Sequence, residues 1–290
     1  MEGRIVKGVA GFYDVLTRDG IYVCHAKGIF RKDHRKPLIG DLVQMEITHA
    51  QDREGSILEI LPRKNELIRP AIANVDRALV IFAVKSPNPN LNLLDRFLTN
   101  MQLHGIPCVI CFNKADLLSK EERVQFAETA EKLPYPVLFT SAKKGEGTEE
   151  LRAILEHGIT TVAGPSGVGK SSLINLLQSR VEMETGDISA KIGRGRHTTR
   201  HAQLIPVGED GWIADTPGFT SLEIPQVRYE ELWKLFPEFA PFEPECRFSG
   251  CLHMAEPDCG IKQAVERGEI AAMRYENYRQ MLLECKDKNR

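Results

Sequence analysis

Three features that would tie a protein to a membrane or to a polyanion are missing from this sequence. The N-terminal MEGRIVKG lacks the charged start and apolar run of a secretory signal, and no later segment approaches the roughly 20 apolar residues of a membrane-spanning helix. The formal net charge is -2, so no global excess of positive charge draws the molecule onto nucleic acid. We therefore expect a cytoplasmic protein without a membrane partner, whose nucleic-acid contacts depend on local basic patches.

Cysteine is also scarce. The chain has seven cysteines, and three of them crowd into residues 246–259 beside a histidine. An odd count with one local cluster argues against a disulfide framework and suits a metal site in a reducing compartment. Cys24, Cys108 and Cys111 lie in strand-like apolar runs, so we predict that they are core residues.

The segment 4–62 alternates short strand-like runs with turn residues. It predicts a small β-barrel of four or five strands, for which an OB-fold that binds RNA is one candidate and a barrel without a ligand is the other. The runs are 12–16, 21–26, 42–48 and 56–61. A basic loop within 30–38 could either grip phosphates or remain a solvated loop. Its basic residues are Arg31, Lys32, Arg35 and Lys36.

From Val75 onward, apolar strands alternate with amphipathic helices. This alternation predicts a parallel sheet covered on both faces, with ligands at the carboxyl ends of the strands. The expected strands begin at 77, 106, 136 and 159, and the expected helices span 93–105, 119–132 and 148–157. Past residue 222 the chain is rich in Pro and Glu and closes with a helical stretch around 273–284, a smaller unit whose apolar core looks thin.

Residues 164–171, GPSGVGKS, match the phosphate-binding loop pattern and lie between an apolar strand and a helix. Gly164 and Gly169 would let backbone amides face a β-phosphate, Lys170 would reach the β- and γ-oxygens, and Ser171 would ligate magnesium. The predicted nucleotide contacts of this segment are Gly164, Pro165, Ser166, Gly167, Val168, Gly169, Lys170, Ser171 and Ser172.

Two further segments predict recognition of guanine rather than adenine. NKAD (113–116) ends an apolar strand, and its Asp116 would accept both N–H groups of the guanine edge, with Asn113 tying the loop and Lys114 packing over the base. SAK follows another strand and would present a backbone amide near Ala142 to the base oxygen. The residues of this second loop are Ser141, Ala142 and Lys143.

The remaining expected elements of a GTP site follow the phosphate loop. DTPG (215–218) supplies Asp215 for the magnesium shell and the Gly218 amide for the γ-phosphate. The basic segment 191–200 offers Thr198 and Thr199 to ligate magnesium and sense the γ-phosphate. The base motifs therefore precede the phosphate loop, whereas an ordinary small G protein starts with it. This order predicts a circular permutation in which the chain after DTPG leads directly into the C-terminal unit.

The motif order, the preceding barrel and the following Cys/His unit resemble the RsgA family, also called YjeQ or YloQ, over essentially the whole chain. The resemblance implies an OB-fold RNA-binding domain at 1–66, a circularly permuted α/β P-loop GTPase domain at 67–222 and a mainly α zinc-binding domain at 223–290. It also implies a role in late maturation of the small (30S) ribosomal subunit. Our hypothesis is a monomeric, ribosome-stimulated GTPase that binds rRNA on that subunit and is released when GTP becomes GDP and phosphate. A permuted GTPase serving the large subunit or tRNA is the alternative.

The cysteine cluster has the spacing C-x4-C-x-H-x5-C, and its residues are Cys246, Cys251, His253 and Cys259. Three thiolates and one imidazole suit tetrahedral zinc with no open position, which predicts a structural site. The zinc domain of the RsgA family has its ligands in the same pattern. Zinc would stabilise a unit with little apolar core. The competing interpretation is a set of ordinary buried thiols.

The residue after the DTPG glycine is Phe219, where Ras-like proteins place the glutamine that orients the attacking water. His197 is therefore the candidate to position that water, as proposed for a histidine in this stretch of similar family members. It could instead merely contact phosphate or RNA. The predicted catalytic residues are Lys170, His197, Thr198 and Thr199. An RNA-binding protein that senses guanine nucleotide with negligible turnover remains the alternative to an enzyme.

Overall fold

The computed structural model describes the chain except residues 27–35, 69, 186–202, 209, 216–223 and 289–290, and it forms two compact units. One unit comprises Met1–Leu79, Thr148–Ala163 and Lys170–Phe219, and the other comprises Val80–Gly147, Gly164–Gly169 and Thr220–Arg290. The three predicted domain ranges stay a prediction, because each unit combines segments that are distant in the sequence. No helix in the described ranges has the length and apolar character needed to cross a membrane.

Several residues with predicted roles lie outside the described ranges, and their roles stay predictions. They are Arg31, Lys32, Arg35, His197, Thr198, Thr199, Gly218 and Phe219.

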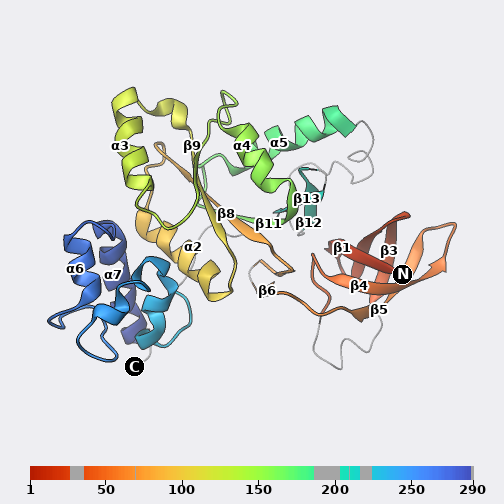
Figure 1. Cartoon of the computed structure of the whole chain (residues 1–290). Helices are drawn as coiled ribbons and strands as arrows, with labels where there is room; N and C mark the ends of the chain where they lie inside the picture. The colour runs from red at the N-terminus through yellow and green to blue at the C-terminus, as the bar shows by residue number, and fades with distance from the viewer. Residues whose placement is uncertain (27–35, 69, 186–202, 209, 216–223, 289–290) are drawn as a thin grey trace. The chain divides into compact units, whose positions relative to one another are not determined.

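The N-terminal part of the first unit is a closed barrel of five strands (Figure 1). The strands are neighbours in the order β1-β2-β3-β5-β4, and β4 also pairs with β1. Only the β3–β5 pair among them is parallel. This arrangement confirms the predicted OB-like barrel. The strands are β1 (Glu2–Val9), β2 (Phe12–Thr17), β3 (Gly20–Ala26), β4 (Leu42–His49) and β5 (Glu54–Ile60).

Alternation of apolar and polar side chains explains how these short strands form a barrel. Residues that point inward at every second position are fully buried, including Val15, Cys24, Val43 and Ile57. Except in β1, where the adjacent Ile5 and Val6 are both buried, the intervening residues are half-buried or exposed, which is the pattern of a sheet with one face in the core.

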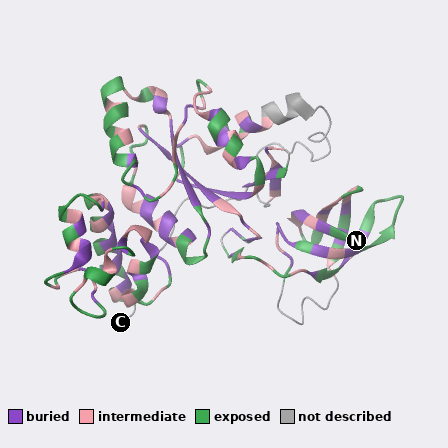
Figure 2. Ribbon diagram, in the orientation of Figure 1, coloured by how far each residue is buried: buried purple, intermediate pink, exposed green. Residues whose placement is uncertain are grey.

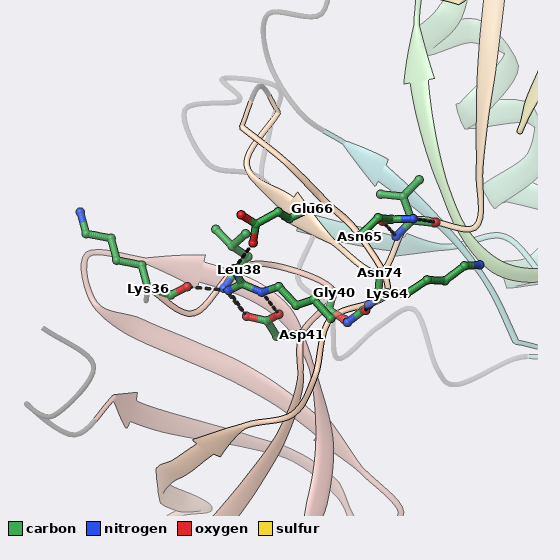
Figure 3. Close-up of polar contacts among 10 residues, drawn as sticks. Lys36, Leu38, Gly40, Asp41, Lys64, Asn65, Glu66 and Asn74 are labelled. Atoms are coloured by element: carbon green, nitrogen blue, oxygen red, sulfur yellow. Dashed lines mark hydrogen bonds and ion pairs between the residues drawn. The ribbon is translucent and has the colours of Figure 1, made fainter. Parts of the chain in front are cut away.

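Polar contacts among Lys36, Asp41, Arg63 and Glu66, called the polar clasp below, close the end of the barrel that leads into residues 61–76 (Figure 3). The guanidinium of Arg63 forms a fork with the fully buried carboxylate of Asp41, at 2.7 and 2.8 Å, and also binds Glu66 and the backbone oxygen of Lys36. Gly40, at φ 87°, packs so closely against the Ala73 carbonyl that a Cβ atom would collide with it. The clasp therefore fixes the chain that leaves the barrel.

Beyond the barrel, the longer strands and helices of the first unit come from later in the chain. They are β11 (His157–Ala163), β13 (Asp210–Asp215), β12 (Gln203–Pro206), α4 (Thr148–Leu155) and α5 (Lys170–Thr185). β11 is parallel to β13, β12 is antiparallel to β13, and β12 meets β1 of the barrel. A small ribbon pairs β6 (Glu66–Leu67) with β7 (Ile72–Ala73). Asp76 links Lys64, the residue after Arg63, to β11, because its carboxylate binds Lys64 Nζ at 3.0 Å and the Ile159 amide at 2.7 Å.

The second unit begins within β8 (Arg77–Ala83) and contains β9 (Cys108–Asn113) and β10 (Val137–Phe139). β9 and β10 are parallel, and nearly every residue of β8 and β9 is buried (Figure 2). Uninterrupted burial is what continuous apolar runs predict for a parallel sheet. The associated helices are α2 (Leu91–Leu103), the short 3-10 helix η1 (Ala115–Leu117) and α3 (Lys120–Ala130), which starts at a capping box of Ser119 and Glu122.

The C-terminal part of the second unit is helical, as predicted. Its elements are η2 (Tyr229–Leu235), η3 (Pro237–Phe239), η4 (Glu243–Glu245), α6 (Gly260–Glu266) and α7 (Ala272–Lys288). An aromatic cluster forms the centre of its core, with the rings of Phe236, Phe239 and Tyr278 between 5.1 and 5.3 Å apart. Cys251 and Cys259 belong to the same buried cluster.

Candidate nucleotide-binding site and metal centre

Asn113, the last residue of β9, joins the two predicted base loops and the phosphate loop within the second unit. Its side chain is almost fully buried. The amide nitrogen donates to the Val168 carbonyl oxygen at 2.8 Å, and the amide oxygen accepts from the Thr140 hydroxyl and the Ala142 backbone N–H, each at 3.2 Å. Asparagine suits this position because one side chain supplies both a donor and an acceptor.

Asp116 is held with its carboxylate as an acceptor. One carboxylate oxygen accepts a hydrogen bond from the Ser141 hydroxyl at 2.6 Å. That hydrogen bond, helped by nearby Lys144 and Lys143, keeps the pKa of Asp116 below its usual value. An ionised carboxylate with capacity left for two N–H donors is the group that the guanine edge requires.

The loop that carries Ser141, Ala142 and Lys143 is a tight turn. The Lys144 and Gly145 amides both donate to the Ser141 carbonyl, at 3.2 and 2.8 Å. The sequence predicts that a backbone amide near Ala142 meets the base oxygen. The Ala142 N–H itself donates to Asn113, and contact between this loop and a base stays a prediction. Thr140 was not anticipated as a site residue, although its place directly before the serine was a usable signal.

Glycine is required at two positions of the phosphate loop. Gly164 has φ 140° and Gly169 has φ 94°, backbone conformations that side chains other than glycine rarely adopt. A Cβ atom on Gly164 would collide with the Ile81 carbonyl oxygen, and one on Gly169 would collide with the Asn113 amide. At these two positions the loop thus approaches β8 and the last residue of β9 too closely for a side chain.

The helix α5 begins at Lys170, directly after Gly169. A helix N-terminus supplies free N–H groups that favour an anion. Burial lowers the pKa of the Lys170 amine, so phosphate oxygens beside it would restore a favourable environment for the ammonium ion. Ser171 and Ser172 follow in the first turn and are exposed. Asp215 ends β13, but its side chain lies outside the described part of the structure.

The four predicted metal ligands come together. Their donor atoms lie within 4.8 Å of one another, and His253, Cys251 and Cys259 are buried. His253 Nδ1 is 3.6 Å from Cys246 Sγ and 3.4 Å from Cys259 Sγ, and these two sulfur atoms are 3.9 Å apart. Tetrahedral zinc places neighbouring sulfur ligands about 3.8 Å apart, so the group has the size of a single-ion site.

The protonation chemistry of the cluster also fits a metal ion. Burial lowers the pKa of His253 to about 4, so the imidazole is neutral and ready to coordinate. Burial raises the pKa of Cys251 to about 12 in the metal-free group, so a bound cation would have to displace the thiol proton. The Nε2 atom of His253 is buried and has no hydrogen-bond partner among the described residues. The rings of Trp233, Phe239 and Tyr278 surround the imidazole at 5.9 to 6.2 Å. Coordination through Nδ1 would leave Nε2–H facing this aromatic shell.

The other cysteines are core residues. Cys24, Cys108, Cys111 and Cys285 are buried, and burial raises the pKa of both Cys108 and Cys111 to about 12. These thiols are therefore poor nucleophiles at neutral pH, and they lie outside the group of Cys/His donors that could hold a metal ion.

Predicted base-recognition loops that follow strands of a parallel sheet and precede the phosphate loop in the sequence are the arrangement of the circularly permuted GTPases. The model of the RsgA N-terminal domain matches residues 2–57, and that of the RsgA GTPase matches residues 60–225. The chain belongs to the RsgA family, and it is a GTPase.

Relatives and solved structures agree with this assignment. The "Small ribosomal subunit biogenesis GTPase RsgA" of Agathobacter rectalis is 50% identical over 301 residues, covering 100% of both chains. The protein of the same name from Caldanaerobacter subterraneus is 48% identical, over 100% of this chain and 97% of its own. The crystal structure of YjeQ from Thermotoga maritima is 37% identical over 98% of each chain, with a TM-score of 0.84. YloQ, described as a circularly permuted GTPase, is 38% identical over 99% of this chain and 95% of its own, with a TM-score of 0.82.

Proposed function

We propose that this GTPase acts in late maturation of the small ribosomal subunit, where it binds rRNA, is stimulated by the subunit, hydrolyses GTP to GDP and phosphate, and then leaves. The names of its relatives support a role in biogenesis of the small ribosomal subunit, and they favour an enzyme over a sensor with negligible turnover. The observation that carries the nucleotide assignment is Asn113, whose side chain links the phosphate loop to the loop that anchors Asp116.

The proposed nucleotide site uses the residues expected from the sequence. Asp116 accepts the guanine N–H groups, the loop 164–169 and Lys170 hold the phosphates, and Ser171 with Asp215 binds magnesium. His197, Thr198 and Thr199 are proposed to act at the γ-phosphate. The Cys/His cluster is proposed to bind one structural zinc ion, because its spacing and donor set match those of closed zinc sites.

Exchanging the acceptor that reads guanine tests the nucleotide assignment. Asp116→Asn should weaken GDP binding at least tenfold, because an amide nitrogen facing the guanine N–H groups replaces attraction with repulsion. The measurement is equilibrium titration with GDP and ADP, and Asp52→Asn, an exposed residue of a barrel turn, is the matched control. Unchanged discrimination between guanine and adenine would disprove the site.

The barrel has a surface suited to unpaired RNA bases. Phe12 is 48% exposed, and its ring lies 4.4 Å from that of His25 on the neighbouring strand. Arg4 and Lys7 of β1 pair in register with Leu16 and Asp14 of β2. These two residues lie on the same face of β2 as Phe12, because alternate residues of a strand share a face. Aromatic rings flanked by basic side chains bind single-stranded nucleic acid by stacking and charge.

Binding to purified subunits tests the ribosomal part of the proposal. The protein should cosediment with small subunits in a non-hydrolysable GTP analogue more strongly than in GDP, and not with large subunits. Phe12→Ala should weaken this binding, whereas Leu58→Ala, an exposed apolar residue of the same barrel, should not. Equal affinity in the two nucleotide states would defeat release by hydrolysis.

A further inference from the structure

A buried group of charges joins α7 to α2 within the second unit. Arg274 of α7 and Asp95 of α2 are both fully buried, and the guanidinium donates to the Asp95 carboxylate. Its other nitrogens form a fork with Glu238 at 2.6 and 3.0 Å, while Asn277 donates to the second Asp95 oxygen at 2.6 Å. Because buried charges are stable only with well-placed partners, this ion cluster permits few alternative positions of α7 against α2.

The same helix α7 holds the loop that carries two of the metal ligands. The hydroxyl of Tyr275 donates to the His253 carbonyl oxygen at 2.7 Å. The hydroxyl of Tyr278 donates to the Leu252 carbonyl oxygen at 2.8 Å, and its ring lies against the His253 imidazole. A displacement of α7 would therefore move residues 251–253.

At its N-terminal end, α2 is connected to both proposed nucleotide loops. The segment 84–90 precedes the helix, and the Asn90 side chain caps the first turn by accepting from the Leu93 amide at 3.0 Å. Lys114 of the base loop donates to the Ser86 carbonyl oxygen. Pro87 lies beside the phosphate loop, since a Cβ atom on Gly167 would be 3.9 Å from its Cδ. Ordering these loops around a nucleotide would restrain the start of α2.

We propose that the ion cluster of Asp95, Arg274, Glu238 and Asn277 couples the metal centre to the nucleotide-binding loops, so that zinc and guanine nucleotide each bind more tightly when the other is present. This inference rests on the nucleotide and zinc assignments above. Coupling between two sites is reciprocal and usually amounts to about 5- to 150-fold in affinity. Arg274 and Asp95 act here as positioning residues, because neither touches the metal ligands nor the nucleotide loops.

Zinc release measures the coupling without any hydrolysis assay. The zinc-loaded full-length protein is mixed with an excess of a chromophoric chelator, alone, with saturating GDP or with ADP. We expect GDP to slow zinc release by roughly fivefold or more, and ADP to have no effect. In Asp95→Asn, release should be faster without nucleotide and should no longer respond to GDP. Glu276→Gln, the same acid-to-amide change at an exposed site of α7, should behave like the wild type.

Binding of a fluorescent GDP analogue, recorded on the same samples, separates the possible failures. If GDP binds the wild type but leaves zinc release unchanged, the coupling is wrong and the proposed nucleotide site stands. A response that persists in Asp95→Asn would show that the ion cluster does not carry it. Should Asp95→Asn fail to fold, Asn277→Ala removes one bond of the cluster and should reduce the response. If no guanine nucleotide binds, the proposed function fails first.

Discussion

Replacing Asn113 with alanine would disconnect three loops at once. The change removes the 2.8 Å bond to the Val168 carbonyl and the two 3.2 Å bonds from Thr140 and Ala142. Val168 is buried and Ala142 is half-buried, so two backbone groups lose their partner with little access to water. Leaving a buried polar group unsatisfied costs about 1–3 kcal/mol. We therefore expect the free energy of unfolding to fall by about 2–4 kcal/mol.

Nucleotide binding should suffer in the same variant, because the phosphate loop and the base loops would no longer share one anchor. We expect GDP affinity to fall roughly 10- to 100-fold, since each factor of ten corresponds to about 1.4 kcal/mol. Urea unfolding monitored by circular dichroism and GDP titration are the two assays. Asn100→Ala is the control, because the Asn100 amide donates within its own helix, to the Arg96 carbonyl oxygen.

A second substitution separates the donor from the acceptor. Asn113→Asp keeps the oxygen that accepts from Thr140 and Ala142 but directs a carboxylate at the Val168 carbonyl. It should lower the stability at least as much as alanine does, because a buried carboxylate then faces a carbonyl oxygen, and it should also lose GDP affinity because it adds negative charge beside the phosphate loop. The reasoning is refuted if Asn113→Ala loses less than about 1 kcal/mol of stability and binds GDP as the wild type does.

Further predictions concern the phosphate loop, the metal centre and acid stability. Gly164→Ala should abolish GDP binding because its Cβ collides with a carbonyl oxygen, whereas Gly105→Ala, also at positive φ but facing open space, should only lower the melting temperature slightly. Chelation of zinc, or Cys259→Ser, should reduce helical circular dichroism from the C-terminal part, and unchanged spectra would exclude a structural metal. Burial raises the pKa of Asp76, but hydrogen bonds from Ile159 and Lys64 outweigh burial and hold it below its usual value. This carboxylate therefore stabilises the fold above about pH 4 and loses that effect as the pH falls through its folded pKa. Urea midpoints between pH 3 and 6 should show a weaker acid dependence in Asp76→Asn.

The periodic spacing of apolar residues identified most strands and helices, because it reflects which face of each element is buried. The expected helix 93–105 corresponds to α2 at Leu91–Leu103, and the expected run 42–48 corresponds to β4 at Leu42–His49. β1 was not among the recognised runs. Its apolar Ile5 and Val6 are adjacent and the register shifts between Ile5 and Lys7, so strict alternation is lost.

Short polar motifs identified the residues whose type and spacing are set by the ligand that they are expected to bind. The phosphate-loop pattern and the spacing of the Cys/His group can be read within one short segment each, and the structure brings the four metal donors within 4.8 Å. The collisions that require glycine at 164 and 169 involve Ile81 and Asn113, which are distant in the sequence. The order of the motifs along the chain was sufficient to predict the permutation, because a permutation is defined by the order in which the motifs occur in the sequence.

Partners that are distant in the chain could be found only in the tertiary structure. Asp95 and Arg274 are 179 residues apart, and Arg63 and Asp41 are 22 apart. In the sequence each is one more charged residue, the type that usually lies at the surface. Their burial, and the assignment of Asn113 to the Val168 carbonyl, depend on which elements pack together. Local patterns determined the elements and the chemistry of the motifs, whereas long-range packing decided which charges are buried and which loops share an anchor.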